Sequence, residues 1–327
     1  MVFMQAALCK SLDGPSALVI EDIPVPDPGS GEVRVRVHAC ALNFFDTLIT
    51  RGKYQYKPQL PFSPAGEIAG VVDAVGPGVA EFKIGQRVCG FIGWGGARTF
   101  AIAQANALIP IPDGVSDEIA AGVSVTYGTA MHGLIDRGRL QAGDTVAVLG
   151  ASGGAGLAAV EIAKLMGARV IAAASSDDKL AVCTSHGADA VLNYATSDLK
   201  QGLRDLTAGR GPDVIYDCVG GDHAEPALRA IGWMGRYLVI GFAGGPIPKI
   251  PLNLPLLKSC DIIGVFWGEV ALRNPAAHTA NIARVLAWIA TGALKPHVHA
   301  VLPLEQIGAA LGMLDRREVT GKLVLAV

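Results

Sequence analysis

The segment from Asp144 to Gly167 reads DTVAVLGASGGAGLAAVEIAKLMG, and it constrains the fold more than any other part of the chain. It begins as a short apolar strand, continues through a glycine-rich turn and ends in a helical pattern. Gly153 would let the backbone approach a pyrophosphate, and Gly156 would let the helix pack closely on the strand. Free N–H groups at the start of such a helix favour an anion. The segment predicts a dinucleotide-binding turn in an α/β domain, and the alternative is a glycine turn that binds nothing.

Residues around this turn also bear on the choice of cofactor. Ala151 stands where the first glycine of the G-x-G-x-x-G pattern would be. The next apolar run ends at Ser175, close to where an acidic residue would bind the ribose of NAD. Ser175 and Ser176 carry no charge to repel a 2′-phosphate, and Lys179 could neutralise one, so the pattern predicts NADPH. The pair Asp177–Asp178 argues against this, unless it only begins the following helix.

The rest of the chain contains two kinds of segment. A length of 327 residues is too great for one ordinary core, so two domains are expected. The first third sets short alternating runs such as EVRVRVHACAL between glycine and proline residues, which predicts an irregular antiparallel β domain. From a helix start near Ser116, apolar strands alternate with helical patterns, which predicts βαβ units and a parallel sheet. The tail returns to mixed helix and strand.

Composition excludes several classes of function. A net charge of −2 provides no basic field for nucleic acid and no polybasic patch for a membrane. The apolar runs are too short to span a membrane, and the N-terminus lacks the apolar core of a signal peptide. Six scattered cysteines without a C-x-x-C pair are typical of buried thiols in a reducing compartment. We therefore expect a cytoplasmic protein that binds neither nucleic acid nor membrane.

Several segments, taken in order, resemble the zinc-free quinone oxidoreductase branch of the medium-chain dehydrogenase/reductase family. They are PGSGEVRVRVHACALNFFD, AGVVDAVGPGVAEFKIGQRV, GASGGAGLAAVEIAKLMGA, GADAVLNY, DVIYDCVGG and TGKLVLAV, and they span nearly the whole chain. The resemblance implies an α/β fold in which a Rossmann-type doubly wound parallel-sheet domain is inserted into a GroES-like β-rich domain, with the active site in the cleft between them. It places the discontinuous GroES-like catalytic domain at residues 1–122 and 267–327 and the NADP-binding domain at residues 123–266.

Zinc can be considered separately. Zinc-dependent members of the family hold the catalytic metal through a Cys of a C-x-x-D motif and a His of a G-H-E motif. The matching places here hold Asn43, in NFFD, and Gly66, in PAGE. Asn is a poor zinc ligand and Gly has no side chain, so no tetrahedral site is expected there. The four-cysteine structural loop is missing, and no histidine has ligand spacing with a cysteine. We expect no metal.

The resemblance also implies which residues contact the substrate. Asn43 matches a family position near the nicotinamide, where its amide could donate to a carbonyl oxygen, and capping a turn is its alternative role. Tyr54 matches a tyrosine at the substrate mouth, where its hydroxyl could hydrogen-bond a quinone oxygen or act as a weak acid with an ordinary pKa near 10. Its alternative role is packing with a solvated hydroxyl. Leu48 replaces another family tyrosine and suggests a more apolar pocket. Trp94 could cover a flat acceptor, although surface packing is the simpler interpretation.

Contacts with NADPH follow partly from the glycine turn and partly from the resemblance. The turn supplies Ala151, Ser152, Gly153, Gly154 and Ala155, and the strand after it supplies Ser175, Ser176 and Lys179. The remaining contacts implied by the resemblance are Asn43, Thr129, Tyr194, Val219, Gly241, Phe242, Ala243, Phe266, Trp267, Arg317 and Lys322. Thr129 could instead bond within its own helix. Phe266 and Trp267 could belong to the core or to a dimer interface, and charges such as Arg317 and Lys322 are usually solvated.

The sequence therefore predicts a zinc-independent, NADPH-dependent quinone oxidoreductase with a small-molecule acceptor. Electron-poor acceptors need little beyond orientation and a polar contact, whereas an ordinary ketone would need a Lewis acid or a poised general acid. A reductase of conjugated enones or 2-enoyl-CoA is the enzymatic alternative, with Lys53 or Lys57 attracting a CoA phosphate. An NADPH-binding sensor or crystallin-like protein is the non-catalytic alternative. The resemblance further implies a homodimer joined through edge strands of the cofactor domains.

Overall fold

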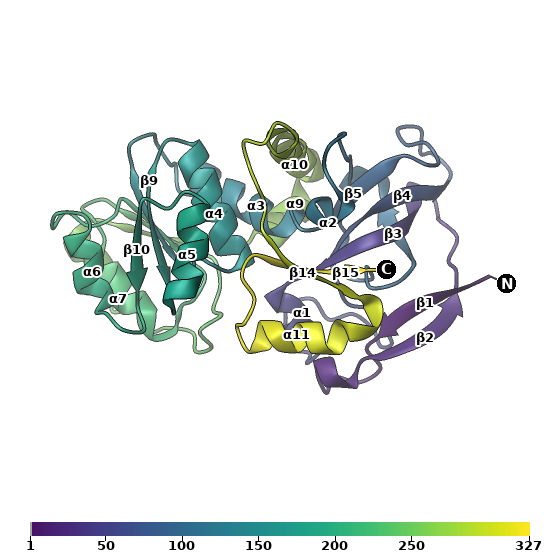
Figure 1. Ribbon diagram of the computed structural model, residues 1–327, viewed down its shortest axis with the longest axis horizontal. Helices are drawn as coiled ribbons and strands as arrows, with labels where there is room; N and C mark the ends of the chain where they lie inside the picture. The colour runs from purple at the N-terminus through teal and green to yellow at the C-terminus, as the bar shows by residue number, and fades with distance from the viewer. Residues whose placement is uncertain (1) are drawn as a thin grey trace. The chain divides into compact units, whose positions relative to one another are not determined.

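Two compact units make up the structure, a computed structural model that describes residues 2–327. The first unit contains the chain up to Val125 together with Ala271–Gly292 and Pro296–Val327. The second contains Thr126–Val270 and Ala293–Lys295. Both ends of the chain thus belong to the first unit, whose ribbon is purple to blue and yellow in Figure 1. This confirms the predicted fold, a parallel-sheet domain inserted into a β-rich one.

A seven-stranded sheet forms the centre of the first unit, with the order β14-β15-β3-β4-β5-β7 and β6 paired to β3. The pairs are antiparallel except for β14 with β15. Val33, Val35 and Val37 of β3 are buried while the residues between them are less so, which confirms the predicted half-buried strand. The strands are β3 Glu32–Leu42, β4 Glu67–Val75, β5 Arg87–Phe91, β6 Phe100–Gln104, β7 Leu108–Pro110, β14 Val298–Pro303 and β15 Lys322–Ala326.

Further elements complete the first unit. A separate antiparallel pair of strands lies at its N-terminal end. The predicted helix start is confirmed, because the Ser116 hydroxyl accepts the N–H of Ile119 at the N-cap of α2. These elements are β1 Phe3–Leu8, β2 Val19–Pro24, α1 Phe44–Ile49, α2 Asp117–Ala121, α10 Pro275–Ala290 and α11 Ile307–Asp315, while α9 Trp267–Arg273 crosses the boundary between the units.

A six-stranded parallel sheet forms the second unit, in the order β10-β9-β8-β11-β12-β13. Because β8 lies between β9 and β11, the strand order reverses beside it, and doubly wound sheets bind ligands at such a point. The strands are β8 Thr145–Leu149, β9 Arg169–Ala174, β10 Ala190–Asn193, β11 Val214–Asp217, β12 Arg236–Val239 and β13 Asp261–Gly264.

Helices cover both faces of this parallel sheet. On one face, α6, α7 and α8 pack against side chains such as Ala147, Ile171 and Ile215, which form a single buried cluster with them. The helices α4 and α5 lie on the other face (Figure 1). These helices are α3 Ser124–Met131, α4 Gly154–Leu165, α5 Asp177–Ser185, α6 Leu199–Asp205, α7 Ala224–Ala230 and α8 Asn253–Lys258.

Candidate functional site

The glycine turn of the second unit has the close packing that its sequence predicts. Gly150 has φ +70°, a conformation that glycine adopts without strain. A Cβ at Gly156 would lie 2.2 Å from the carbonyl oxygen of Gly150, so only glycine allows α4 to approach the end of β8 this closely. The N–H groups of Gly150 and Ala151 donate to Ala173 O at 3.0 and 3.1 Å, which fastens the turn to β9. Helix α4 then begins at Gly154, and its first N–H groups lack acceptors within the helix. The turn therefore fits a pyrophosphate.

The end of β9 carries the residues expected at a 2′-phosphate. Asp177 begins α5, whose N-cap Ser176 accepts the N–H of Lys179 at 3.4 Å, so the acidic pair opens a helix as the sequence allowed. The carboxylate of Asp177 accepts from Asn193 Nδ2 at 2.8 Å. Ser175 is exposed, and Lys179 Nζ lies 3.4 Å from its hydroxyl oxygen. A small hydroxyl and an ammonium thus lie together where an NAD-binding protein would have a carboxylate.

An aromatic pair lies beyond the next strand. The ring of Tyr194, the predicted neighbour of the 2′-phosphate, has its centroid 4.4 Å from the ring of His223 at an angle of 43°. The N–H of Tyr194 donates to Ala174 O at 3.1 Å, which ties this residue to the end of β9. The chain therefore brings Tyr194 to the same edge of the sheet as Ser175. Sequence reasoning did not identify His223.

Asp217 organises the loops that hold the next group of predicted cofactor contacts. Its buried carboxylate accepts the N–H groups of Val219 and Gly220 at 2.8 and 2.9 Å and bonds the hydroxyl of Tyr237. Burial and this carboxylate hold the pKa of the Tyr237 phenol well above its usual value. The N–H of Ala243 donates to Cys218 O at 3.1 Å, so the loops after β11 and β12 are joined. The predicted contacts at Val219 and at Gly241, Phe242 and Ala243 lie on these two fixed loops.

Thr129 and Trp267 lie close together in the second unit. Thr129 on α3 is buried, and Trp267 at the start of α9 is buried as well. A Cβ at Gly128 would lie 2.5 Å from Trp267 Nε1, so glycine makes room for this ring beside Thr129. Phe266, by contrast, is exposed. The packing of Trp267 matches the alternative role in the core that the sequence left open.

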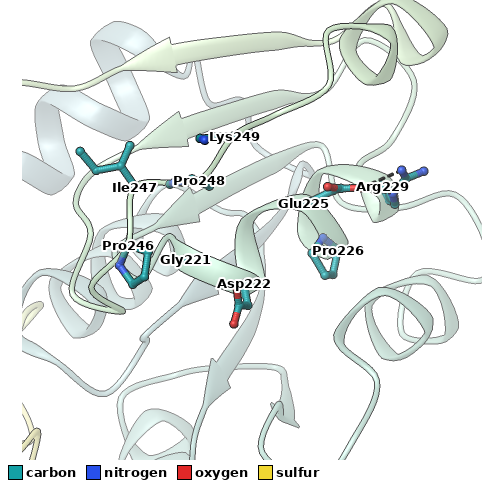
Figure 2. Close-up of a pocket in the computed structure, with 9 residues that line it drawn as sticks. All are labelled: Gly221, Asp222, Glu225, Pro226, Arg229, Pro246, Ile247, Pro248 and Lys249. Carbon is teal, nitrogen blue, oxygen red and sulfur yellow. Dashed lines mark hydrogen bonds and ion pairs between the residues drawn. The ribbon is translucent and has the colours of Figure 1, made fainter.

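A separate pocket of about 490 Å³ lies beside the loop that follows β11 (Figure 2). Figure 2 shows the side chains of Glu225 and Arg229 joined in an ion pair on α7, with a distance of 2.6 Å between Oε1 and Nη2. None of the predicted site residues lines this pocket. Its lining residues are Gly221, Asp222, Glu225, Pro226, Arg229, Pro246, Ile247, Pro248 and Lys249.

Asn43 is the N-cap of α1 in the first unit and lies in a buried polar cluster. Its N–H donates to Asp46 Oδ2 at 2.8 Å, and Asp46 Oδ1 accepts the N–H of Ala65 at 3.0 Å. Asn43 Nδ2 donates to Glu67 Oε2 at 2.8 Å. Asn43 thus occupies the N-cap position of α1, while its side-chain amide is directed to a buried carboxylate from β4.

Lys322 completes this cluster from β15. Its ammonium donates to Glu67 Oε2 at 2.7 Å, to Asn43 Oδ1 at 2.8 Å and to Leu42 O at 3.2 Å. These contacts account for the three N–H donors of a lysine. The charge is buried rather than solvated, because only 5% of the residue is exposed. The alternative of a solvated charge is therefore wrong for Lys322, because its ammonium is directed into the interior of the first unit.

Burial also changes the acidity of this cluster. Removal from water raises the pKa of the Asp46 carboxyl to about 7. The N–H groups of Asn43 and Ala65 and the Lys322 ammonium act in the opposite direction, while the nearby Glu67 adds to the rise. Glu67 and Asp46 were not identified from the sequence. A lone acid at the start of the apolar run EIAGVV and an acid three positions after Asn43 were the available signals.

An array of aromatic rings connects the two predicted substrate residues. Phe45 stacks on Tyr54 with centroids 5.2 Å apart, Tyr54 lies 5.5 Å from Tyr56, and Tyr56 lies 6.3 Å from Trp94. Phe91 meets Phe45 edge-on at 6.5 Å. Trp94 is 42% exposed, so the array continues to the surface of the unit. Sequence reasoning found Tyr54 and Trp94 but not Tyr56 between them, nor Phe45 and Phe91 beyond Tyr54.

The acidity of Tyr54 differs from the sequence-based expectation. The ordinary pKa of a tyrosine is near 10. Burial raises the pKa of the Tyr54 phenol to about 12, and the nearby Tyr56 and Asp46 add to this rise. The physical cause is loss of water around the charged form. Tyr54 therefore stays protonated at neutral pH and is a hydrogen-bond donor rather than an acid that gives up its proton.

Neither place compared with the zinc ligands of relatives can hold a metal in this arrangement. The amide of Asn43 bonds Glu67 and Lys322. A Cβ at Gly66 would lie 2.5 Å from the carbonyl oxygen of Gly93, which leaves no room for a histidine. In residues 2–327, no three His, Cys, Asp or Glu side chains are grouped as metal ligands. The donor set therefore does not fit zinc.

Arg317, the last predicted contact, is exposed in the turn after α11 and has φ +58°. Lys53 and Lys57, the candidate CoA contacts, are exposed on either side of Tyr54 in the sequence.

None of the helices that the structure describes is long and apolar enough to cross a membrane.

The chain is similar to known proteins in both of its units. Residues 29–113 match the family model of the alcohol dehydrogenase GroES-like domain, and residues 154–290 match that of zinc-binding dehydrogenases. Quinone oxidoreductase-like protein 2 of Rattus norvegicus is 39% identical over 324 residues, which is 99% of this chain and 92% of the relative.

Two solved structures are also similar. A mycobacterial protein complexed with NADPH has 30% identity and a TM-score of 0.92, with 99% of this chain and 100% of the other covered. Quinone oxidoreductase of Pseudomonas syringae pv. Tomato DC3000 has 29% identity and a TM-score of 0.93, with the same coverage. Fold and turn define a two-domain oxidoreductase with a nicotinamide-type cofactor site. The chain belongs to the medium-chain dehydrogenase/reductase family, in its quinone oxidoreductase branch.

Proposed function

We propose that the protein is a zinc-independent, NADPH-dependent quinone oxidoreductase. The observation that carries the proposal is the aromatic array from Phe45 through Tyr54 and Tyr56 to Trp94, which offers stacking surfaces to a flat acceptor. Asn43, which the polar cluster surrounds, is the N-cap of the helix that also carries Phe45. A flat ring with carbonyl oxygens matches this combination better than an aliphatic alcohol does.

NADPH, when bound, supplies a hydride to the acceptor. The turn from Gly150 to Gly156 and the start of α4 would hold its pyrophosphate. Lys179 beside Ser175 supports NADPH over NADH, because an ammonium can neutralise a 2′-phosphate. The mycobacterial relative solved with NADPH agrees with this preference.

The chain's own residues orient the acceptor and stabilise developing charge. Asn43 Nδ2 and the protonated hydroxyl of Tyr54 would donate to the carbonyl oxygens of the quinone. Transfer of one hydride and uptake of one proton from water convert the quinone to a hydroquinone, so no side chain has to lose its proton. The reaction therefore requires no side chain that transfers a proton near neutral pH.

Two other functions remain candidates. Lys53 and Lys57 are exposed near Tyr54, and this favours a reductase of enones or 2-enoyl-CoA as the second candidate. A non-catalytic NADPH sensor or crystallin-like protein would need the glycine turn but not the aromatic array.

Measuring the oxidation of NADPH and of NADH with an ortho-quinone and with a short 2-enoyl-CoA tests the proposal. We expect turnover of the quinone, with kcat/KM at least about tenfold higher for NADPH than for NADH. The variant Asn43→Ala/Tyr54→Ala should lose turnover and still bind NADPH. Preference for the enoyl-CoA would establish the second candidate, and NADPH binding without any turnover would establish the third.

We also propose that the protein is a homodimer. Strand β13 is an edge of the parallel sheet, and Ile262 on it is 41% exposed. Trp233 and Met234 lie next to the start of β13, because the N–H of Asp261 on this strand donates to Gly235 O. These large apolar side chains are exposed together with Leu256 and Leu257 on α8, and a second copy of the chain would cover them.

A further inference from the structure

The side-chain amide of Asn43 lies between two buried groups of opposite charge. Glu67 Oε2 accepts from its Nδ2 at 2.8 Å, and the Lys322 ammonium donates to its Oδ1 at 2.8 Å. Glu67 is 0% exposed and Lys322 is 5% exposed. Water therefore screens these interactions little, and their effect on the amide is strong.

These charges allow the amide only one orientation. A carboxylate can only accept and an ammonium can only donate, whereas an amide does one at each end. Turning the amide over would place Oδ1 against Glu67 and the NH₂ group against Lys322, so two charge-assisted hydrogen bonds would become two repulsive contacts.

Both charged groups are themselves held in place. Glu67 Oε1 accepts the N–H of Val125 at 2.7 Å while its other oxygen takes Asn43 and Lys322. The third donor of Lys322 goes to Leu42 O on β3. The backbone of Asn43 is fixed separately through Asp46. The Glu67–Lys322 pair therefore joins β4 to β15 and orients the side-chain amide of Asn43, whose backbone is held in place by Asp46.

We propose that Glu67 and Lys322 are positioning residues that fix Asn43 as a hydrogen-bond donor to the acceptor's carbonyl oxygen. This inference rests on the proposed function, because it assigns a role to Asn43 in quinone binding. One N–H of Nδ2 is used by Glu67, and the second is what the amide offers to a ligand. The ammonium occupies Oδ1, so the amide meets a ligand oxygen as a donor and not as an acceptor.

Removing both charges at once tests the proposal. Either single change leaves a buried charge unpaired and endangers folding, whereas replacing both partners by neutral residues of similar size is often tolerated. In Glu67→Gln/Lys322→Met the introduced amide can pair with Asn43 in either orientation. The matched control is Arg34→Met/Asp73→Asn, which removes an ion pair of 2.7 Å that also joins strands of the same sheet, β3 and β4.

A comparison with Asn43→Ala gives the activity readout. We expect Glu67→Gln/Lys322→Met and Asn43→Ala each to lower kcat/KM for the ortho-quinone about tenfold, and the control to leave it unchanged. The triple variant should be no worse than Asn43→Ala alone, because the pair acts through Asn43. An unchanged kcat/KM in Glu67→Gln/Lys322→Met, or losses that add in the triple variant, would overturn the proposal.

A second readout does not depend on activity. The Asn43 side-chain amide signals in an ¹⁵N-labelled sample are assigned by their loss in Asn43→Ala. In the wild type, one of its two protons should be shifted downfield by the carboxylate, and the shift should vanish in Glu67→Gln/Lys322→Met. Identical signals in both proteins would disprove the fixed orientation. If the wild type reduces no quinone, the proposed function fails, while these signals still decide whether the charged pair fixes the amide.

Discussion

The ring of Tyr54 contacts the rings of Phe45 and Tyr56, and burial raises the pKa of its hydroxyl to about 12. A group whose pKa is this high remains protonated throughout an assay between about pH 6 and 9. We expect Tyr54→Phe to lower kcat/KM for the quinone about tenfold, because one neutral hydrogen bond is lost. The pH profile should keep its shape, since Tyr54 does not titrate in this range. Steady-state rates of both proteins across this range measure both effects, and equal kcat/KM values would remove Tyr54 from the substrate site.

Single residues also show where sequence reasoning stops. Asn43 and Tyr54 could be identified because they lie in motifs that resemble a family. Glu67 and Lys322 meet across β4 and β15, which are far apart in the sequence, and no local pattern records such a contact. Lys322 was therefore expected to be a solvated or cofactor-binding charge, although the sheet buries it.

Among the elements, the turn between β8 and α4 contains two glycines for which we expect different roles. A Cβ at Gly156 would lie 2.2 Å from Gly150 O, whereas a Cβ at Gly153 would lie 3.5 Å from the same oxygen, an ordinary contact. We expect Gly156→Ala to destabilise the protein by about 1–3 kcal/mol, more than the ~1 kcal/mol that alanine adds to a helix.

Gly153→Ala is the matched change, because its backbone has φ −74° and tolerates a side chain. It should leave the thermal midpoint unchanged and weaken NADPH binding about tenfold or more, since a methyl group would meet the pyrophosphate. Thermal unfolding and NADPH titration of both variants separate the two roles. A stable Gly156→Ala protein would show that helix packing does not need this glycine.

Element by element, the strands with a neighbour on each side were the easiest to predict. The apolar runs of β8, β9 and β11 are buried on both faces, so each appears in the sequence as a continuous hydrophobic segment. Strand β13 was not predicted, because Asp261–Gly264 is short and largely exposed. Its place in the sheet depends on pairing with β12, which is a long-range contact that periodicity does not show.

For the whole molecule, the edge strand β13 bears on whether two copies of the chain form a dimer. A second copy pairing with this strand would continue the sheet and cover the exposed Trp233, which is 69% exposed in one chain. A lysine at the centre of this edge would place a charge in the two-fold interface, where each copy contributes it once. We therefore expect Ile262→Lys to convert a dimer into a monomer. Ile84→Lys is the control, because Ile84 is 72% exposed and belongs to the first unit. Sedimentation velocity should give the mass of two chains for the wild type and the control, and of one chain for Ile262→Lys. A monomeric wild type, or a dimeric Ile262→Lys, would show that the exposed apolar residues around β13 do not join two copies.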